Sequence, residues 1–212
     1  KNRPLPAGRM LPSEAISFAA ILGIASITIM GLAINLVAAG LLALTIAFYV
    51  IIYTVWLKPR TPQNIVIGGA AGAFPPMIGW AAVTGSVDLV SISLFLIIFF
   101  WTPPHFWALA LVRSDDYARA NIPMLPNVAG NLATRKQILL YSVILQPITV
   151  LPYILGAVSI GYAIWVGITG FLFVGGAFAL YHQYKERRAM YLFTYSIFYL
   201  FSLFVAMIGF VV

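Results

Sequence analysis

The chain has 212 residues, of which 62% are hydrophobic and only 8% are charged, and it contains no cysteine. A soluble domain carries about 25% charged residues, so a chain this apolar is expected in a lipid bilayer. The absence of cysteine excludes a disulfide framework and a thiolate metal site. The net charge of +7 would suit nucleic acid, but the few basic residues follow membrane topology instead, and no nucleic-acid partner is expected.

Seven apolar stretches are long enough to cross a bilayer as helices, which takes about 20 residues each. They cover residues 14–34, 36–56, 64–84, 89–112, 137–158, 162–181 and 189–212. No Lys or Arg lies in the middle of any stretch, and no soluble domain or internal repeat is left over. The sequence therefore predicts an all-α, polytopic transmembrane helix bundle that forms a single domain over residues 1–212.

The positions of the basic residues support this topology. All twelve fall in the N-terminal segment or in every second connection between the predicted spans. They are Lys1, Arg3, Arg9, Lys58, Arg60, Arg113, Arg119, Arg135, Lys136, Lys185, Arg187 and Arg188. Because Lys and Arg are retained in cytoplasmic loops, we expect these four segments to face the cytoplasm.

Prolines and glycines interrupt several of the predicted spans. The prolines are Pro75, Pro76, Pro103, Pro104, Pro147 and Pro152. Proline frees a backbone carbonyl, and lipid tolerates this only where neighbouring protein or a cavity satisfies the freed group. In the third span, Gly68, Gly69 and Gly72 make one flank thin. Such a flank serves either close helix packing or a groove for a bulky ligand.

The longest polar segment, residues 113–127, directly follows the fourth predicted span. Asp115 and Asp116 are adjacent there and stand among Arg113, Arg119 and Asn121. Carboxylates at a membrane rim suit magnesium, which takes oxygen ligands and shares itself with substrate phosphates. Arginine binds phosphate oxygens in bidentate fashion. The segment is a candidate site for a magnesium-bound phosphate, and an Asp–Arg pair at a helix end is the structural alternative.

A second polar connection, residues 56–64, contains Lys58 and Arg60 between two prolines, Pro59 and Pro62. Prolines restrict the backbone of such a loop, which favours fixed positions for the two charges. The segment either positions these charges for a ligand or serves only as a topology signal.

His105 lies near the middle of the fourth predicted span, in the string WTPPHFW at residues 101–107. An ionisable side chain at membrane depth is a functional hypothesis by default. Its ring would ligate a metal or a haem, or would bind a carbonyl freed by Pro103 or Pro104. No second histidine has ligand spacing, so a zinc site is not expected. The aromatic residues around His105 fill helix interfaces or line a pocket for a prenyl chain, whose carbocation their π faces would stabilise.

Five motifs, in order between residue 2 and about residue 126, resemble the intramembrane prenyltransferase superfamily of UbiA type. They are NRPLPAGR (2–9), LKPRTPQNIVIGG (57–69), GAFPPMIGW (72–80), WTPPHFW (101–107) and DDYARANIPMLP (115–126). The WTPPHFW string resembles the branch of the superfamily that acts on haem. The last three spans are similar to the family only in a general way.

The resemblance implies a nine-helix bundle with a central cavity open to the cytoplasm, in a bacterial inner membrane or a mitochondrial inner membrane. It implies transfer of a farnesyl group from farnesyl diphosphate to a vinyl group of haem B, giving haem O. Magnesium (Mg²⁺) would hold the diphosphate through two aspartate-rich loops. The alternatives are another prenyltransferase of the same superfamily or a polytopic transporter, which kinked helices and a midplane histidine would also suit.

The resemblance also assigns roles to residues of this chain. Asp115 and Asp116 would form the second magnesium site, and with Lys58 they are the expected catalytic residues. Arg60 and Asn64 would face the diphosphate. Further candidates for that contact are Arg3, Arg113 and Arg119.

His105 is the expected residue on the haem side.

Two features depart from the family pattern. The family's first aspartate-rich motif lies upstream of the string at residues 2–9, so that motif and two helices are expected to be missing here and the fragment to be inactive on its own. Position 119 is Arg and position 120 is Ala where the wider superfamily often has Asp-x-x-x-Asp, which fits the haem branch but leaves fewer metal ligands.

Overall fold

The computed structural model describes residues 4–212, and in this range seven helices are long and apolar enough to cross a membrane. The predicted all-α bundle and its number of spans are therefore confirmed for the described chain. The elements are α1 (Pro12–Ala33), α2 (Leu36–Ala47), η1 (Phe48–Leu57), α3 (Asn64–Thr84), α4 (Leu89–Val112), α5 (Ser114–Arg119), α6 (Leu125–Ile154), α7 (Ile160–His182) and α8 (Glu186–Gly209). The segment η1 continues α2 within one span, and α5 is a short helix outside the spans.

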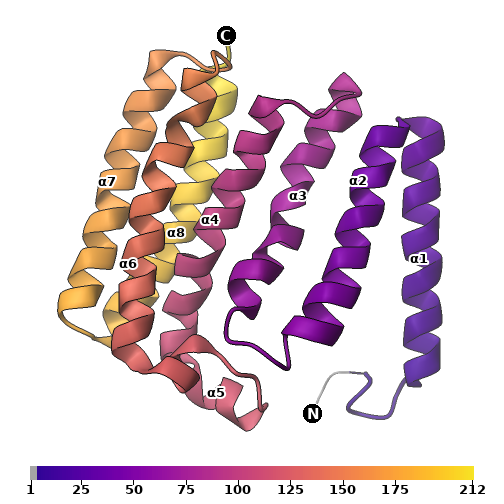
Figure 1. The fold of residues 1–212 in the computed structure, drawn as a ribbon, viewed down its shortest axis with the longest axis horizontal. Helices are drawn as coiled ribbons and strands as arrows, with labels where there is room; N and C mark the ends of the chain where they lie inside the picture. The colour runs from indigo at the N-terminus through magenta and orange to yellow at the C-terminus, as the bar shows by residue number, and fades with distance from the viewer. Residues whose placement is uncertain (1–3) are drawn as a thin grey trace.

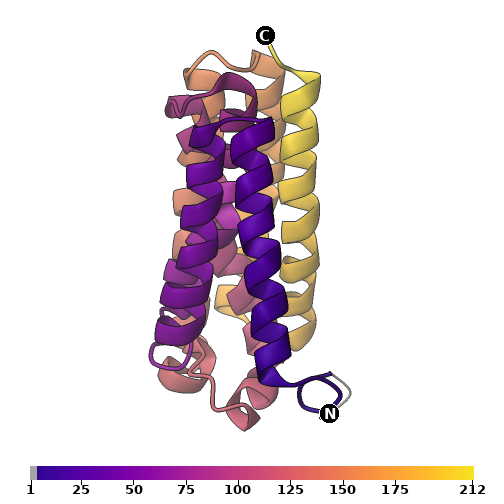
Figure 2. The same ribbon diagram turned by 90° about the vertical axis from the view of Figure 1, so that its right-hand side faces the viewer.

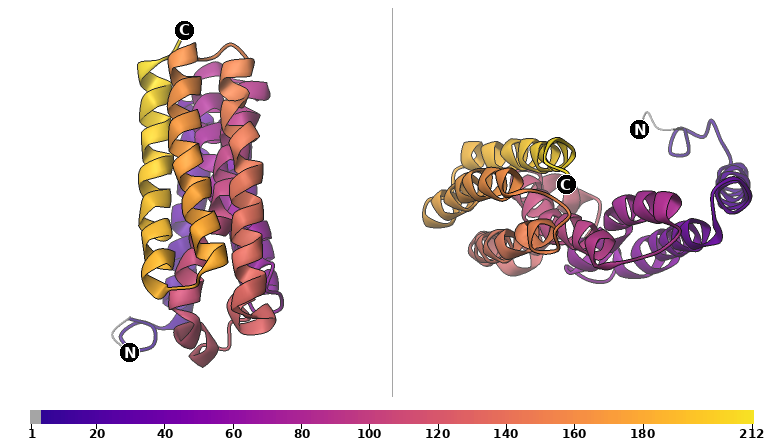
Figure 3. Two further views of the ribbon diagram at one scale, coloured as in Figure 1. Left: turned by 90° about the vertical axis from the view of Figure 1, so that its left-hand side faces the viewer. Right: turned by 90° about the horizontal axis from the view of Figure 1, so that it is seen from above.

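Four of the spans form a compact group, and the other three, α3, α2 and α1, continue from it as an open row (Figure 1 and Figure 3). Helix α4 is central and packs against α3, α6 and α8, and α7 closes a compact group of four by packing against α6 and α8. At the other end of the row, α1 packs only against α2 among the helices of the described chain, and none of its residues is buried. The apolar core therefore lies in the C-terminal half.

Four basic segments lie at one end of the bundle. The N-terminal segment, the η1–α3 connection, α5 and the α7–α8 connection all lie at the lower end (Figure 1 and Figure 2). Two arginines at this end also stabilise α7, since Arg135 Nη1 donates to the Tyr181 carbonyl at 2.7 Å and Arg188 Nη1 donates to the Ala179 carbonyl at 2.9 Å. Cations bound to the last carbonyls of a helix satisfy free acceptors and oppose the helix dipole.

At the opposite end, Asn35 ties together the turn between α1 and α2 and the end of α3. Its Oδ1 accepts from the Ala38 amide at 2.9 Å and caps α2. Its Nδ2 donates to the carbonyls of Ala81 at 2.9 Å and Ala82 at 3.2 Å. The amide side chain therefore joins α2 to α3, and the Asn35 backbone amide, which donates to the Met30 carbonyl at 3.1 Å, joins the same turn to the end of α1.

The fifth span differs from its predicted range of 137–158. Helix α6 begins at Leu125 and ends at Ile154, with a break in helical geometry at Gly130, where φ is +81°. Hydropathy detects only the part of a helix that lies in hydrocarbon, and residues 131–136 are a polar turn that continues the helix beyond it. Similarly, α8 spans Glu186–Gly209 where residues 189–212 were predicted, and the Phe210 carbonyl just beyond its end accepts from the Ser159 amide at 2.8 Å.

The second span contains a π-helix, η1, that the sequence does not reveal. In η1, Thr54 Oγ1 donates to the Tyr49 carbonyl, five residues earlier, at 2.8 Å. The ring of Tyr53 lies against α3 at Gly68, where an added Cβ would come within 2.1 Å of it. Gly68 is thus required for this close approach. Segments of π-helix occur frequently at functional sites.

Candidate functional site

A pocket of about 390 Å³ opens between η1, α3 and α4. It is lined by Tyr49, Tyr53, Ile65, Gly68, Gly69, Gly72, Ile98, Trp101, Thr102 and Phe106. Both interpretations of the glycine flank hold in different places. Gly68 and Gly69 admit the side chains of Tyr53 and Thr102 at close range, whereas an added Cβ at Gly72 would meet nothing within 4 Å.

One end of this pocket lies beside α5, which carries the two aspartates. Ile65 lines the pocket and packs in one cluster with Tyr117 of α5. Burial raises the pKa of Tyr117, and the carboxylate of Asp116 raises it further. The structure therefore brings the aspartate segment and the aromatic pocket together.

The two aspartates have different surroundings, although both are exposed. Asp116 forms ion pairs with Arg113 at 3.4 Å and with Arg119. Within the described residues, Asp115 has no ion pair. Asn127 Nδ2 donates to the Ser114 carbonyl at 2.9 Å and ties the start of α5 to the start of α6. The Asp–Arg pairs expected if the segment only caps a helix end are therefore present at Asp116. The carboxylate of Asp115 remains available to a ligand.

Asp115 and Asp116 fit magnesium as part of a site. In residues 4–212 no group of three or more His, Cys, Asp or Glu residues is placed to hold a metal ion. Magnesium does not require such a group, because it commonly takes one or two carboxylates and completes its octahedron with water and substrate phosphates. Arg113 and Arg119 beside Asp116 are side chains of the kind that bind phosphate oxygens.

The candidates on the η1–α3 connection are engaged locally. Arg60 Nη1 donates to the carbonyls of Val55 at 3.3 Å and Trp56 at 3.2 Å, at the end of η1. Asn64 is buried, and its Nδ2 donates to the Thr61 carbonyl at 2.7 Å, which shapes the turn before α3. Lys58 is half-buried and pairs with no carboxylate in the described part of the chain. Arg3 lies outside the described residues.

His105 is buried against α8, with 8% of its surface exposed. Its ring stacks on Trp101, with centroids 4.2 Å apart, and on Phe193, with centroids 4.6 Å apart. Its Nδ1 lies 2.6 Å from the Ser196 hydroxyl. This partner is neither a carbonyl freed by proline nor a metal, and a serine in an apolar span gives no sequence signal for it. Trp101 and Phe106, whose rings both contact the His105 ring, also line the pocket.

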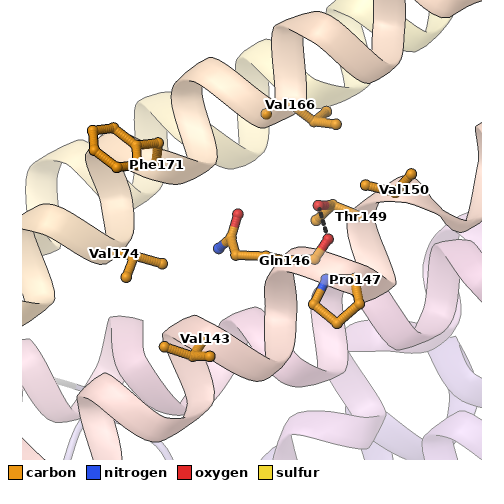
Figure 4. Close-up of a pocket in the computed structure, with 9 residues that line it drawn as sticks. Val143, Gln146, Pro147, Thr149, Val150, Val166, Phe171 and Val174 are labelled. Atoms are coloured by element: carbon orange, nitrogen blue, oxygen red, sulfur yellow. Dashed lines mark hydrogen bonds between the residues drawn. The ribbon is translucent and has the colours of Figure 1, made fainter.

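A larger cavity of about 480 Å³ lies between α6 and α7 (Figure 4). Its lining is apolar apart from Thr149 and Gln146, whose side chain reaches into the space between the helices (Figure 4). The Gln146 Nε2 group donates to the Ser142 carbonyl at 2.8 Å. No predicted site residue lines this cavity, and the exposed Phe171 beside it is typical of a groove on the lipid side. We therefore take the η1–α3–α4 pocket as the candidate site.

Comparison with known proteins gives consistent matches over nearly the whole chain. The UbiA prenyltransferase family matches residues 1–208. The chain is 54% identical over 209 residues to protoheme IX farnesyltransferase 2 of Mesorhizobium japonicum, with 97% of this chain and 67% of the relative covered. It is 55% identical over 212 residues to protoheme IX farnesyltransferase of Parvibaculum lavamentivorans, with 96% and 65% covered. The chain thus spans about two thirds of the length of these curated relatives.

A solved structure of digeranylgeranylglyceryl phosphate synthase has the same fold. It superposes with a TM-score of 0.82 over 98% of this chain and 73% of that chain, at 22% sequence identity. At this identity the likeness concerns the arrangement of the helices alone.

Proposed function

The chain belongs to the UbiA prenyltransferase family, and we propose that the protein transfers a farnesyl group from farnesyl diphosphate to a vinyl group of haem B, giving haem O. The observation that carries the proposal is the aspartate pair of α5 beside an aromatic pocket. The names of the two curated relatives support the choice of substrates. Family membership disfavours the transporter alternative.

The reaction breaks the bond between the farnesyl carbon and the diphosphate oxygen, and the diphosphate leaves. The vinyl group attacks the allylic cation, and water adds to the new cation beside the porphyrin and loses a proton. Magnesium, when bound, neutralises charge on the leaving diphosphate. In the proposal, Asp115 and Asp116 hold that ion. The cationic side chains Lys58, Arg60, Arg113 and Arg119 stabilise the same developing charge.

The pocket is proposed to take the prenyl chain. Its aromatic walls match an apolar chain, and the faces of Tyr53, Trp101 and Phe106 attract a cation. An apolar enclosure also keeps water away from the allylic cation until the new carbon–carbon bond exists. The haem is proposed to bind on the side of His105, whose neighbours Trp101 and Phe106 belong to the pocket. In this proposal, the two reacting carbons meet beside Trp101 and Phe106.

The proposal is tested with the full-length protein in membranes. Radiolabelled farnesyl diphosphate, haem B and magnesium are supplied, and extracted haems are identified by mass spectrometry. A labelled haem that carries a hydroxyethylfarnesyl group, with release of diphosphate, is the expected result. Farnesyl on a different acceptor would identify another prenyltransferase of the family. Movement of either substrate across the membrane without chemical change would identify a transporter.

We also propose that the end of the bundle with the basic segments faces the cytoplasm, because cytoplasmic loops retain Lys and Arg. In intact cells, an impermeant thiol reagent applied from outside is expected to label an Asp88→Cys variant and to spare an Arg60→Cys variant. Both positions are exposed at opposite ends of α3 and its flanking turns. Labelling of Arg60→Cys alone would reverse the orientation, and labelling after cell lysis serves as the control for reactivity.

A further inference from the structure

Helix α8 contacts the ring of His105 through the hydroxyl of one serine, Ser196. Ser196 Oγ donates to the Phe193 carbonyl at 2.6 Å, and the same oxygen lies 2.6 Å from His105 Nδ1. A serine hydroxyl has one proton to donate, and a carbonyl oxygen can only accept. With the serine proton donated to the Phe193 carbonyl, the hydrogen bond to the imidazole requires a proton on Nδ1.

Neighbouring aromatic rings also fix the orientation of the His105 ring. Trp101 stacks on one face and Phe193 on the other. Trp101 is itself fixed, because its Nε1 donates to the Ser196 carbonyl at 2.8 Å. Ser196 thus contacts both the imidazole and the indole that stacks on it. Packing and hydrogen bonding together leave the ring one orientation.

The protonation of Nδ1 determines the state of the other ring nitrogen, Nε2. With the proton on Nδ1, a neutral imidazole carries its lone pair on Nε2. Within the described residues, Nε2 has no hydrogen-bond partner. It is also not among the fully buried side-chain atoms that lack a partner, which are Trp107 Nε1 and Tyr199 Oη in that part of the chain. The lone pair on Nε2 is therefore unused by the described residues.

We infer that Ser196 is a positioning residue that holds His105 as a neutral, Nδ1-protonated imidazole whose Nε2 binds the iron of the haem substrate. The inference rests on the proposed function. Histidines that ligate metals donate their other ring N–H to a hydrogen-bond acceptor, which fixes the tautomer and raises the basicity of the ligand. Ser196 supplies that acceptor, so α8 contributes to the site.

The first test measures the tautomer in the unaltered full-length protein by ¹⁵N NMR of the histidine rings, assigned with a His105→Gln variant. A protonated Nδ1 and an unprotonated Nε2 are expected. A proton on Nε2 would overturn the inference without the need for any serine variant.

The second test compares haem binding by absorption titration. Ser196→Ala is expected to weaken haem B binding about 10- to 100-fold, as the loss of a ligand's hydrogen-bond partner typically does, and to change the spectrum of the bound haem. Ser196→Thr keeps the hydroxyl and should restore both. The matched control is Ser202→Ala, because Ser202 also lies buried in α8 and donates to the carbonyl three residues earlier, at 3.0 Å.

The outcomes separate this inference from the proposed function. If the unaltered protein makes farnesylated haem while Ser196→Ala binds haem as tightly as Ser202→Ala does, the role of Ser196 is wrong and the activity stands. If the unaltered protein makes no farnesylated haem, the proposed function fails instead. Farnesyl diphosphate affinity should be unchanged in Ser196→Ala, and a parallel loss of both affinities would show a general defect in folding and overturn the inference.

Discussion

Replacing either aspartate of α5 is expected to lower the turnover of the full-length protein about 100- to 1000-fold, which corresponds to about 2.7–4 kcal/mol in the barrier. This is the typical effect of losing a group that stabilises developing charge in a transition state. In Asp116→Ala, Arg113 and Arg119 also lose their ion-pair partner. Turnover is measured from initial rates of farnesyl transfer over a range of magnesium concentrations.

The stability of these variants should change little, because both aspartates are exposed and surface ion pairs contribute only about 0–1 kcal/mol. Asp88→Ala is the matched control. Asp88 accepts from the Ser91 amide at 2.9 Å and caps α4 at the opposite end, so its loss should cost about 0.5–2 kcal/mol of stability and leave turnover close to that of the parent. Near-normal farnesyl transfer by both α5 variants at low magnesium would remove the aspartates from the site.

Filling the pocket at Gly72 is expected to lower kcat/KM about 10- to 100-fold without a loss of stability. Gly72 lines the pocket, and an added Cβ there would meet no atom within 4 Å. A leucine side chain at this position projects into space that the prenyl chain is proposed to occupy, and such overpacking typically costs about 1–3 kcal/mol. Steady-state kinetics with farnesyl diphosphate as the varied substrate measure the effect.

Gly79→Leu is the control for Gly72→Leu. Gly79 lies seven residues further along α3, and an added Cβ there is also free of contacts, but Gly79 does not line the pocket. Both replacements remove a helical glycine, which favours the helix by about 0.5–1 kcal/mol. Equal kinetics in the two variants would show that the prenyl chain binds elsewhere.

The spans were predictable from the sequence because their apolar stretches match the thickness of the bilayer. Two features were not. The start of α6 at Leu125 lies in a polar stretch where hydropathy gives no signal. The π-helical geometry of η1, within which Tyr53 packs against Gly68, has no signal in its residue types.

The charged part of the candidate site was predictable for a related reason. In a chain with so few charges, Asp115, Asp116 and Lys58 stand out against their apolar surroundings. The position of His105 was predictable too, but its partner was not. Ser196 lies 91 residues away in sequence, and buried serines in helices commonly bind their own backbone, so only the packing of α4 against α8 reveals the contact.

The hydrogen bonds of Asn35 decide where the end of α1 is attached to the bundle. The helix is tied to the bundle at one end, and along its length it meets only α2. A helix of 22 residues is about 33 Å long. Along that length, the faces of α1 that turn away from α2 are not covered by any other helix of the described chain.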